Sequence, residues 1–162
     1  MALPLQSCHG MSEIAEELRQ RTFRYFLRIL SFCRQRLPDI WDCREIGRQL
    51  LRAGMGVSGN YWSACRGRST DEFITKLGVA TDEADESVLW MTAVIQSGIN
   101  QDSETKDLLR EGQELRAILS KSHKTAKENR LRKKRAAREA RNGRQIINSS
   151  TRQLTKSTGG LP

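Results

Sequence analysis

The feature that most constrains the fold is an apolar repeat with helical period in residues 49–90. In its second half the repeat is strict, because positions follow one another alternately by four and three residues. These positions are Phe73, Leu77, Ala80, Ala84, Ser87, Met91 and Val94. Such a heptad seam packs one stripe of a helix against a neighbouring helix. The first half is rich in glycine and serine, and small side chains let two helix backbones approach closely. The pattern therefore predicts two packed helices at the centre of the protein.

Four helices are predicted in the chain, joined by turns of only a few residues. Pro38 and Gly98 stand where the first and third helices should end. Ser69 is followed three residues later by Glu72, which is a capping box for the start of the third helix. Short connections favour antiparallel neighbours, so the predicted fold class is all-α, an up-down-up-down four-helix bundle. The predicted helices span residues 12–37, 39–65, 70–96 and 103–120.

The first helix is expected to bury more than one narrow stripe, and the second to pack closely through its small residues. Additional aromatic and leucine positions widen the stripe of the first helix, which predicts two buried faces. Its main stripe is Ile14, Leu18, Thr22, Tyr25, Ile29 and Cys33. Interior glycines in the second helix each cost about 1 kcal/mol relative to alanine. Close packing against another helix is the expected compensation, and we predict it at Gly54, Ser58 and Gly59.

Charge is distributed very unevenly along the chain. Residues 1–120 contain 15 Lys and Arg against 17 Asp and Glu, whereas residues 121–162 contain 13 against 2. A nearly neutral body with a polycationic extension favours polyanions as partners, chiefly nucleic acid, with an anionic membrane surface second. The predicted organisation is a disordered leader, a four-helix bundle, a basic helical extension and a disordered tail, at residues 1–11, 12–120, 121–144 and 145–162.

The basic extension is the principal candidate for nucleic-acid binding. A row of cations attracts phosphates through counterion release without reading the base sequence. The extension has no aromatic residue, so it offers no platform for base stacking. A solvated tail that improves solubility is the alternative, and the string LRKKRAAREAR also fits a nuclear-localisation pattern. The predicted contacts are Lys121, Lys124, Lys127, Arg130, Arg132, Lys133, Lys134, Arg135, Arg138, Arg141 and Arg144.

Two smaller features have alternative interpretations. Arg66 and Arg68 precede the third helix, where a helix N-terminus could hold a phosphate between them, and an ordinary exposed turn is the alternative. Tyr61 and Trp62 are adjacent in sequence and cannot share one helix face. One of them must point away from the main seam, which would indicate an interface, unless the core is broad enough to take both.

The sequence contains no constellation typical of catalysis, so we expect no enzyme, no cofactor and no metal. The acidic residues between Asp82 and Glu86 lack an accompanying histidine or nucleophile, which favours a solvated or salt-bridged face. The four cysteines form no CxxC pair, and His9 and His123 lie in presumed tails as bystanders. No segment fits a signal peptide or a membrane span, so we expect a cytoplasmic protein without a membrane partner.

Residues 49–90 also resemble a known family. The residues that carry the resemblance are Gln49, Leu50, Arg52, Ala53, Gly54, Val57, Ser58, Asn60, Tyr61, Arg68, Ser69, Glu72, Phe73, Ile74, Lys76, Leu77, Ala80, Glu83, Ala84, Glu86, Ser87 and Trp90. In this pattern the chain resembles the four-helix-bundle proteins of the 23S rRNA intervening-sequence family. The accessory variability determinant proteins of diversity-generating retroelements look like the same family. The resemblance extends over about residues 18–119.

This resemblance implies an assembly and a function. The implied assembly is a barrel-like homopentamer. The implied function lies near RNA, since some members are encoded inside ribosomal RNA genes and the retroelement members assist a reverse transcriptase and bind nucleic acid. We therefore expect a non-enzymatic accessory protein that binds RNA or DNA in support of a reverse transcriptase. The alternative is a homo-oligomeric protein-interaction scaffold whose basic tail binds an acidic partner.

Overall fold

A computed structural model describes the backbone of residues 13–158 and the side chains of residues 13–142. The regular secondary structure of this part of the chain is four helices: α1 (Glu13–Gln35), α2 (Trp41–Cys65), α3 (Thr70–Gln96) and α4 (Ser103–Thr158). Contacts divide the chain after Lys124 into two compact units, which we call the body and the arm. Helix α4 therefore contributes to both. The predicted leader, residues 1–11, lies outside the described residues. Between residues 13 and 158, no helix has a stretch long and apolar enough to span a bilayer.

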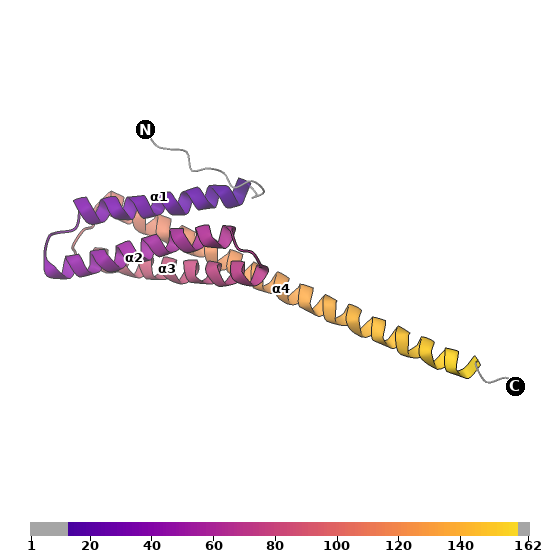
Figure 1. Cartoon of the computed structure of the whole chain (residues 1–162). Coiled ribbons are helices and arrows are strands. Elements are labelled where there is room, and N and C mark those ends of the chain that lie inside the picture. The colour runs from indigo at the N-terminus through magenta and orange to yellow at the C-terminus, as the bar shows by residue number, and fades with distance from the viewer. Residues whose placement is uncertain (1–12, 159–162) are drawn as a thin grey trace. The chain divides into compact units, whose positions relative to one another are not determined.

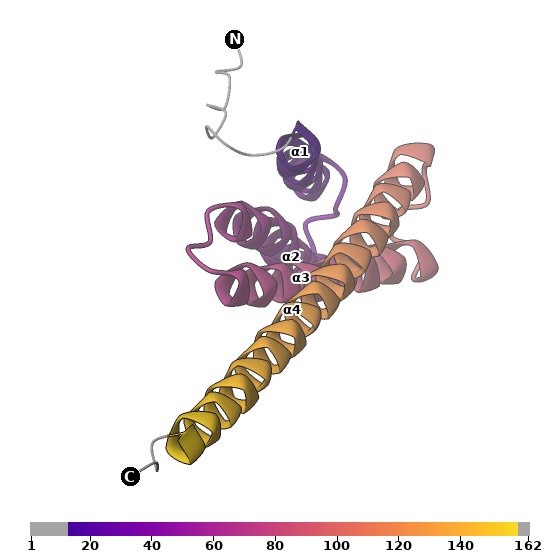
Figure 2. The same cartoon turned by 90° about the vertical axis from the view of Figure 1, so that its right-hand side faces the viewer.

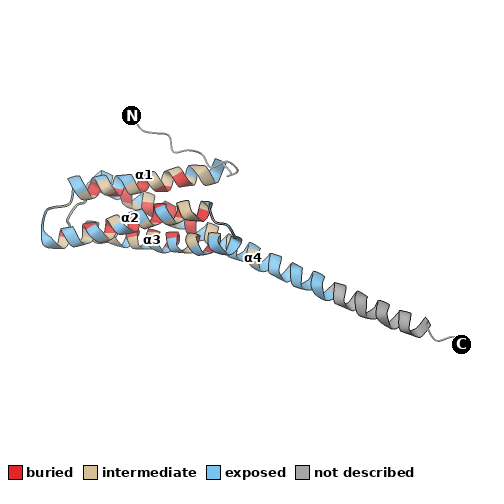
Figure 3. Cartoon of the chain, viewed as in Figure 1, coloured by how far each residue is buried: buried red, intermediate tan, exposed pale blue. Residues whose placement is uncertain are grey.

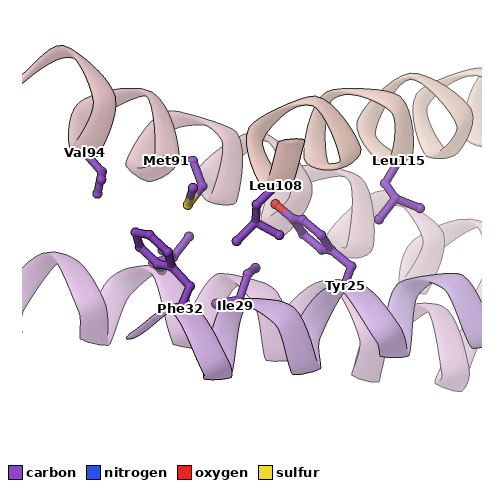
Figure 4. Close-up of a cluster of buried hydrophobic side chains, with 8 residues drawn as sticks. Tyr25, Ile29, Phe32, Met91, Val94, Leu108 and Leu115 are labelled. Atoms are coloured by element: carbon purple, nitrogen blue, oxygen red, sulfur yellow. The ribbon is translucent and has the colours of Figure 1, made fainter. Parts of the chain in front are cut away.

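The body confirms the predicted helical bundle. Helices α1, α2 and α3 run side by side (Figures 1 and 2). The first part of α4 joins them through a shared core, in which side chains from α1 meet those of α3 and α4 (Figure 4). The buried members of this cluster are Tyr25, Ile29, Phe32, Leu50, Met91, Val94, Leu108 and Leu115. A second cluster joins α2, α3 and α4 and contains Val57, Tyr61, Ala64, Leu77, Ala80, Ala84 and Leu119.

Helix α3 follows the heptad prediction closely. Six of the seven seam positions, from Leu77 to Val94, are buried, and Phe73 is half-buried. The Ser69 hydroxyl accepts a hydrogen bond from the Glu72 amide at 3.1 Å, as a capping residue should. The Glu72 carboxylate accepts from the Arg68 amide at 2.9 Å, one residue before the position that the capping box predicts. Gly98 adopts φ 78°, a conformation that favours glycine, and it follows the last turn of the helix.

The glycines of α2 only partly follow the close-packing prediction. At Gly54 an added Cβ would lie 2.7 Å from Cδ1 of Ile29, so α1 approaches the backbone there. At Gly56 it would overlap the carboxyl group of Glu83. Ser58 is buried, as predicted. The prediction for Gly59 is wrong: it is exposed, and an added Cβ would meet no atom within 4 Å. Glycine content identifies an unusual helix but not which glycine faces a neighbour.

Helix α1 confirms part of the predicted stripe: Thr22, Tyr25 and Ile29 are buried, and Leu18 is half-buried. Ile14 is 79% exposed, because it lies in the first turn, beyond the reach of the other helices. Phe32 is buried, whereas Cys33 is only half-buried. Arg19 is 1% exposed and enters the core region in place of an apolar side chain. The predicted second buried face is only half-buried at Phe23 and Phe26.

Helix α4 continues well beyond the predicted basic segment. Its helical backbone extends to Thr158, whereas the sequence predicted regular structure only to residue 144. No proline interrupts residues 125–158, and alanine, lysine and arginine, which are good helix formers, dominate the first half of this stretch. Burial ends near the limit of the body, and the described side chains of the arm are almost all exposed (Figure 3).

Candidate nucleic-acid interface

The arm holds most of the cations that the sequence singled out. Eight predicted contacts lie between Lys127 and Arg141, where the only carboxylates are Glu128 and Glu139. Arg130 is half-buried, and the other seven cations are exposed. Lys121 and Lys124 are also exposed and belong to the part of α4 within the body. Arg144 lies in the helix, but its side chain lies outside the described residues. The structure therefore has the helix that the sequence predicted for this charge run, and it shows that most of the cations are accessible.

Neighbouring side chains distinguish the arm cations from one another. Arg132 and Arg135 share a shallow depression with Glu128 and Glu139, together with Leu131 and Ala136. One guanidinium nitrogen of Arg132 also donates to Oδ1 of Asn129 at 3.1 Å. Both acidic residues therefore lie on one side of the helix, where they reduce the local positive potential. The arm is thus not uniformly cationic around its circumference.

The turn between α2 and α3 forms a second cationic feature. Arg66 and Arg68 are exposed and line a depression of about 470 Å³ together with Ser63, Glu72 and Lys76. Ser69 and Glu72 already accept hydrogen bonds from the amides of Glu72 and Arg68 at this helix start. A phosphate here would contact the two guanidinium groups and the lysine, beside the carboxylate of Glu72. This arrangement brings the two predicted arginines together but favours the alternative of an exposed turn over a helix N-terminal anion site.

The adjacent aromatic residues of α2 point in different directions. Tyr61 is 6% exposed and belongs to the second core cluster. Trp62 is half-buried and lines a surface groove of about 430 Å³ between α1 and α2. The other lining residues are Phe23, Phe26, Met55, Ser58, Gly59 and Arg66. Of the first interpretation, this outcome confirms only that one aromatic residue points away from the main seam; the interface stays a prediction.

Arg19 is a buried charged residue that the sequence did not single out. Its guanidinium binds the Glu16 carboxylate twice, at 2.8 Å through Nε and at 2.5 Å through a terminal nitrogen. The guanidinium carbon also lies 4.0 Å from the ring centroid of Trp62. Charge-assisted bidentate bonds and cation–π contacts are both stabilising, so Arg19 joins α1 to α2. An arginine three residues from a glutamate was the available signal, but its burial depends on where Trp62 lies.

The acidic residues of α3 act as separate structural groups. Asp85 pairs with Arg116 of α4 at 3.1 Å, and Glu86 accepts from the indole nitrogen of Trp90 at 3.3 Å. Oε2 of Glu83 is buried against the backbone of Gly56, and burial raises the pKa of this carboxyl group, with a further contribution from Glu86. Within residues 13–158, no group of three His, Cys, Asp or Glu side chains is arranged to hold a metal ion.

His123 and the described cysteines lie among packed residues of the body. The sequence placed His123 in a tail, but its ring packs against Gly78 of α3, where an added Cβ would lie 3.1 Å from Cε1. Among the described residues, Cys33, Cys43 and Cys65 form no disulfide. Burial raises the pKa of the Cys33 thiol to about 11, and its Sγ donates to the Gly47 carbonyl at 3.6 Å. These contacts indicate packing groups rather than reactive ones.

Comparison with known proteins gives a similar structure but no sequence family. No protein-family model matches the chain, and no curated protein matches it. Among solved structures, it is similar to the crystal structure of a protein of unknown function from the S23 ribosomal protein family of Bacteroides thetaiotaomicron VPI-5482. The TM-score is 0.60 at 19% sequence identity, and the match covers 68% of this chain and 97% of that chain. At this identity the similarity shows a shared four-helix fold.

Proposed function

We propose that this protein is a non-enzymatic accessory protein that binds RNA or DNA through its basic arm, in support of a reverse transcriptase. The observation that carries this proposal is the exposed cationic helix between Lys127 and Arg141, with eight cations and two carboxylates. Neutralised phosphates release condensed counterions, which gives such a surface affinity for any nucleic acid. The resemblance to the retroelement accessory proteins supplies the reverse transcriptase as the proposed partner.

The body supports this division of roles because its own charges are largely matched. Residues 1–124 contain 17 Lys and Arg and 17 Asp and Glu. Arg21 of α1 pairs with Glu111 and Glu114 of α4, and both carboxylates raise the pKa of its guanidinium. A body that neutralises its own arginines leaves little net charge for phosphate. We therefore assign most of the affinity to the arm and a secondary contribution to Arg66 and Arg68.

Truncation at the unit boundary tests this assignment. We expect a chain that ends at Lys124 to keep the helical circular-dichroism signal of the body, because both core clusters lie before that residue. The same chain should lose most binding to RNA and DNA, and the intact protein should bind with a steep salt dependence, about −0.7 to −0.9 per neutralised phosphate. Binding that survives truncation would move the interface to the body. The next measurement would then be nucleic-acid binding by an intact chain in which uncharged residues replace Arg66 and Arg68.

We further propose that the body self-associates as a homopentamer, as the family resemblance implies. The groove between α1 and α2 supports self-association, since Met55 is 48% exposed beside the half-buried rings of Phe23, Phe26 and Trp62. Trp41, at the start of α2, is 81% exposed. Multivalency would then combine weak phosphate contacts from several arms. Light scattering should give a mass several times 18.4 kDa, and a monomer at tens of micromolar would contradict the assembly.

A protein-interaction scaffold is the second candidate function. The same exposed apolar groove and cationic arm would suit an acidic protein partner. The two candidates differ in one measurement: a scaffold would leave nucleic acid unbound even at low salt, where phosphate contacts are strongest.

A further inference from the structure

The cations of the arm are arranged asymmetrically around its helix. At about 100° per residue, five of them fall within about 80° of one another on the helix circumference. We call this set the ridge: Lys127, Arg130, Lys134, Arg138 and Arg141. The ridge runs for about 21 Å along the helix axis, at about 1.5 Å per residue.

The remaining charges occupy the flanks and the back of the same helix. Lys133 and Arg135 adjoin Lys134 in sequence, so each lies about 100° to one side of the ridge centre. Glu128 and Glu139 lie about 120–140° from that centre, in the depression they share with Arg132 and Arg135. Cations thus cover the front and the Lys133 flank, whereas on the other flank both acidic residues lie within about 20–40° of Arg135.

From this geometry we infer that the arm binds double-stranded B-form DNA by lying in the major groove, an inference that rests on the proposed nucleic-acid function. A helix with its side chains is about 10–12 Å across, and the major groove of B-form DNA is about 12 Å wide. A helix in that groove meets a phosphate wall on each side and the electronegative base edges in front. Lys133 and Arg135 then face the two walls, the ridge faces the base edges, and Glu128 and Glu139 lie between the Arg135 wall and solvent.

The same geometry disfavours the other nucleic acids. The major groove of an A-form RNA duplex is too deep and narrow for a helix to enter. Single strands are held mainly by stacking of bases on aromatic side chains, and residues 121–162 contain no Phe, Tyr or Trp.

A comparison of three probes tests the choice of nucleic acid. Fluorescence anisotropy with the full-length protein would use one labelled sequence as a DNA duplex, as its single DNA strand and as an RNA duplex. We expect the DNA duplex to bind at least about tenfold more tightly than the other two at equal salt. Equal or tighter binding of the single strand or the RNA duplex would overturn the inference and leave the proposed function in place. The absence of binding to all three probes would overturn both.

Two adjacent alanines provide a matched test of the face. Ala137 lies about 60° from the ridge centre, within one turn of Lys133, Lys134 and Arg141, whereas Ala136 lies about 160° away. Both side chains are exposed, and Ala137→Glu and Ala136→Glu change the net charge equally. For the DNA duplex, log affinity falls with log salt, and we expect Ala137→Glu to make this fall less steep by about 1–2 in slope, as loss of one or two phosphate contacts would. Ala136→Glu should reduce it by less than half as much. Equal effects would mean that the arm acts as a non-directional polycation, which would overturn the groove geometry.

Discussion

Replacement of Gly54 by alanine tests the closest approach between α1 and α2. An added Cβ would lie 2.7 Å from Cδ1 of Ile29, well inside van der Waals contact, and 3.4 Å from its Cγ2. Ile29 is fully buried, so its side chain cannot move into solvent. Overpacking of this kind costs about 1–3 kcal/mol. Alanine recovers about 1 kcal/mol of helix propensity, so we expect Gly54→Ala to change the free energy of unfolding by about 0 to −2 kcal/mol.

Gly59 provides the control on the same helix. It is exposed and an added Cβ would meet nothing within 4 Å, so Gly59→Ala gains propensity without a clash. We expect the free energy of unfolding to rise by about 1 kcal/mol. Urea denaturation, followed by circular dichroism at two protein concentrations, measures both variants and separates folding from assembly.

The double variant Gly54→Ala with Ile29→Val isolates the cause. Valine lacks the Cδ1 atom that alanine would meet, although Ile29→Val alone costs about 0.5–1.5 kcal/mol. We expect the two changes to be less destabilising together than their sum, with a coupling of about 1 kcal/mol. If Gly54→Ala stabilised the protein as much as Gly59→Ala does, the close approach of the two helices would be refuted.

Two further predictions concern buried charge. Burial raises the pKa of the Glu83 carboxyl group above its ordinary value of 4.5. The stability that the protonated carboxyl group contributes is therefore complete below about pH 4.5, and it is lost as the pH rises through the pKa in the folded state. Glu83→Gln should therefore melt at a higher temperature than the parent at pH 7, with a difference that shrinks toward pH 4, and Asp82→Asn, at an exposed site, serves as its control. Arg19→Lys keeps the charge but loses the bidentate bond and the stacked plane over Trp62. It should lower the free energy of unfolding by about 1–3 kcal/mol in urea denaturation, and an unchanged value would show that charge alone suffices.

The sequence predicted the helices well because their signals are local. The seam of α3 and its cap at Ser69 depend on residues a few positions apart, and periodicity captures such relations directly. The exposure of Gly59 and the burial of Arg19 depend on which side of a helix meets a partner distant in sequence. Helical period alone cannot decide this for a helix such as α2, where small residues occur on every side.

The candidate site was predictable as a charge run but not as a surface. The sequence alone located the cations of the arm. Their exposure, and the depression that Arg132 and Arg135 share with Glu128 and Glu139, are visible only in the structure of the helix. The groove beside Trp62 had one signal, the adjacent aromatic pair at Tyr61 and Trp62. That signal indicated that one ring leaves the seam, but the partners Phe23 and Phe26 come from α1, which lies about 36–39 residues earlier in the chain.

The ridge has an energetic consequence for the arm as a free helix. Arg130, Lys134 and Arg138 stand four residues apart, and like charges at that spacing destabilise a helix by about 0.2–0.5 kcal/mol per pair. Glu128 with Arg132 and Arg135 with Glu139 have the same spacing with opposite charge, so these pairs offset part of this cost. Electronegative base edges along the ridge would reduce the repulsion and leave these opposite-charge pairs in place. Binding of a polyanion on this one face would therefore stabilise the arm helix, whereas a charge run of random order would gain no such directional support.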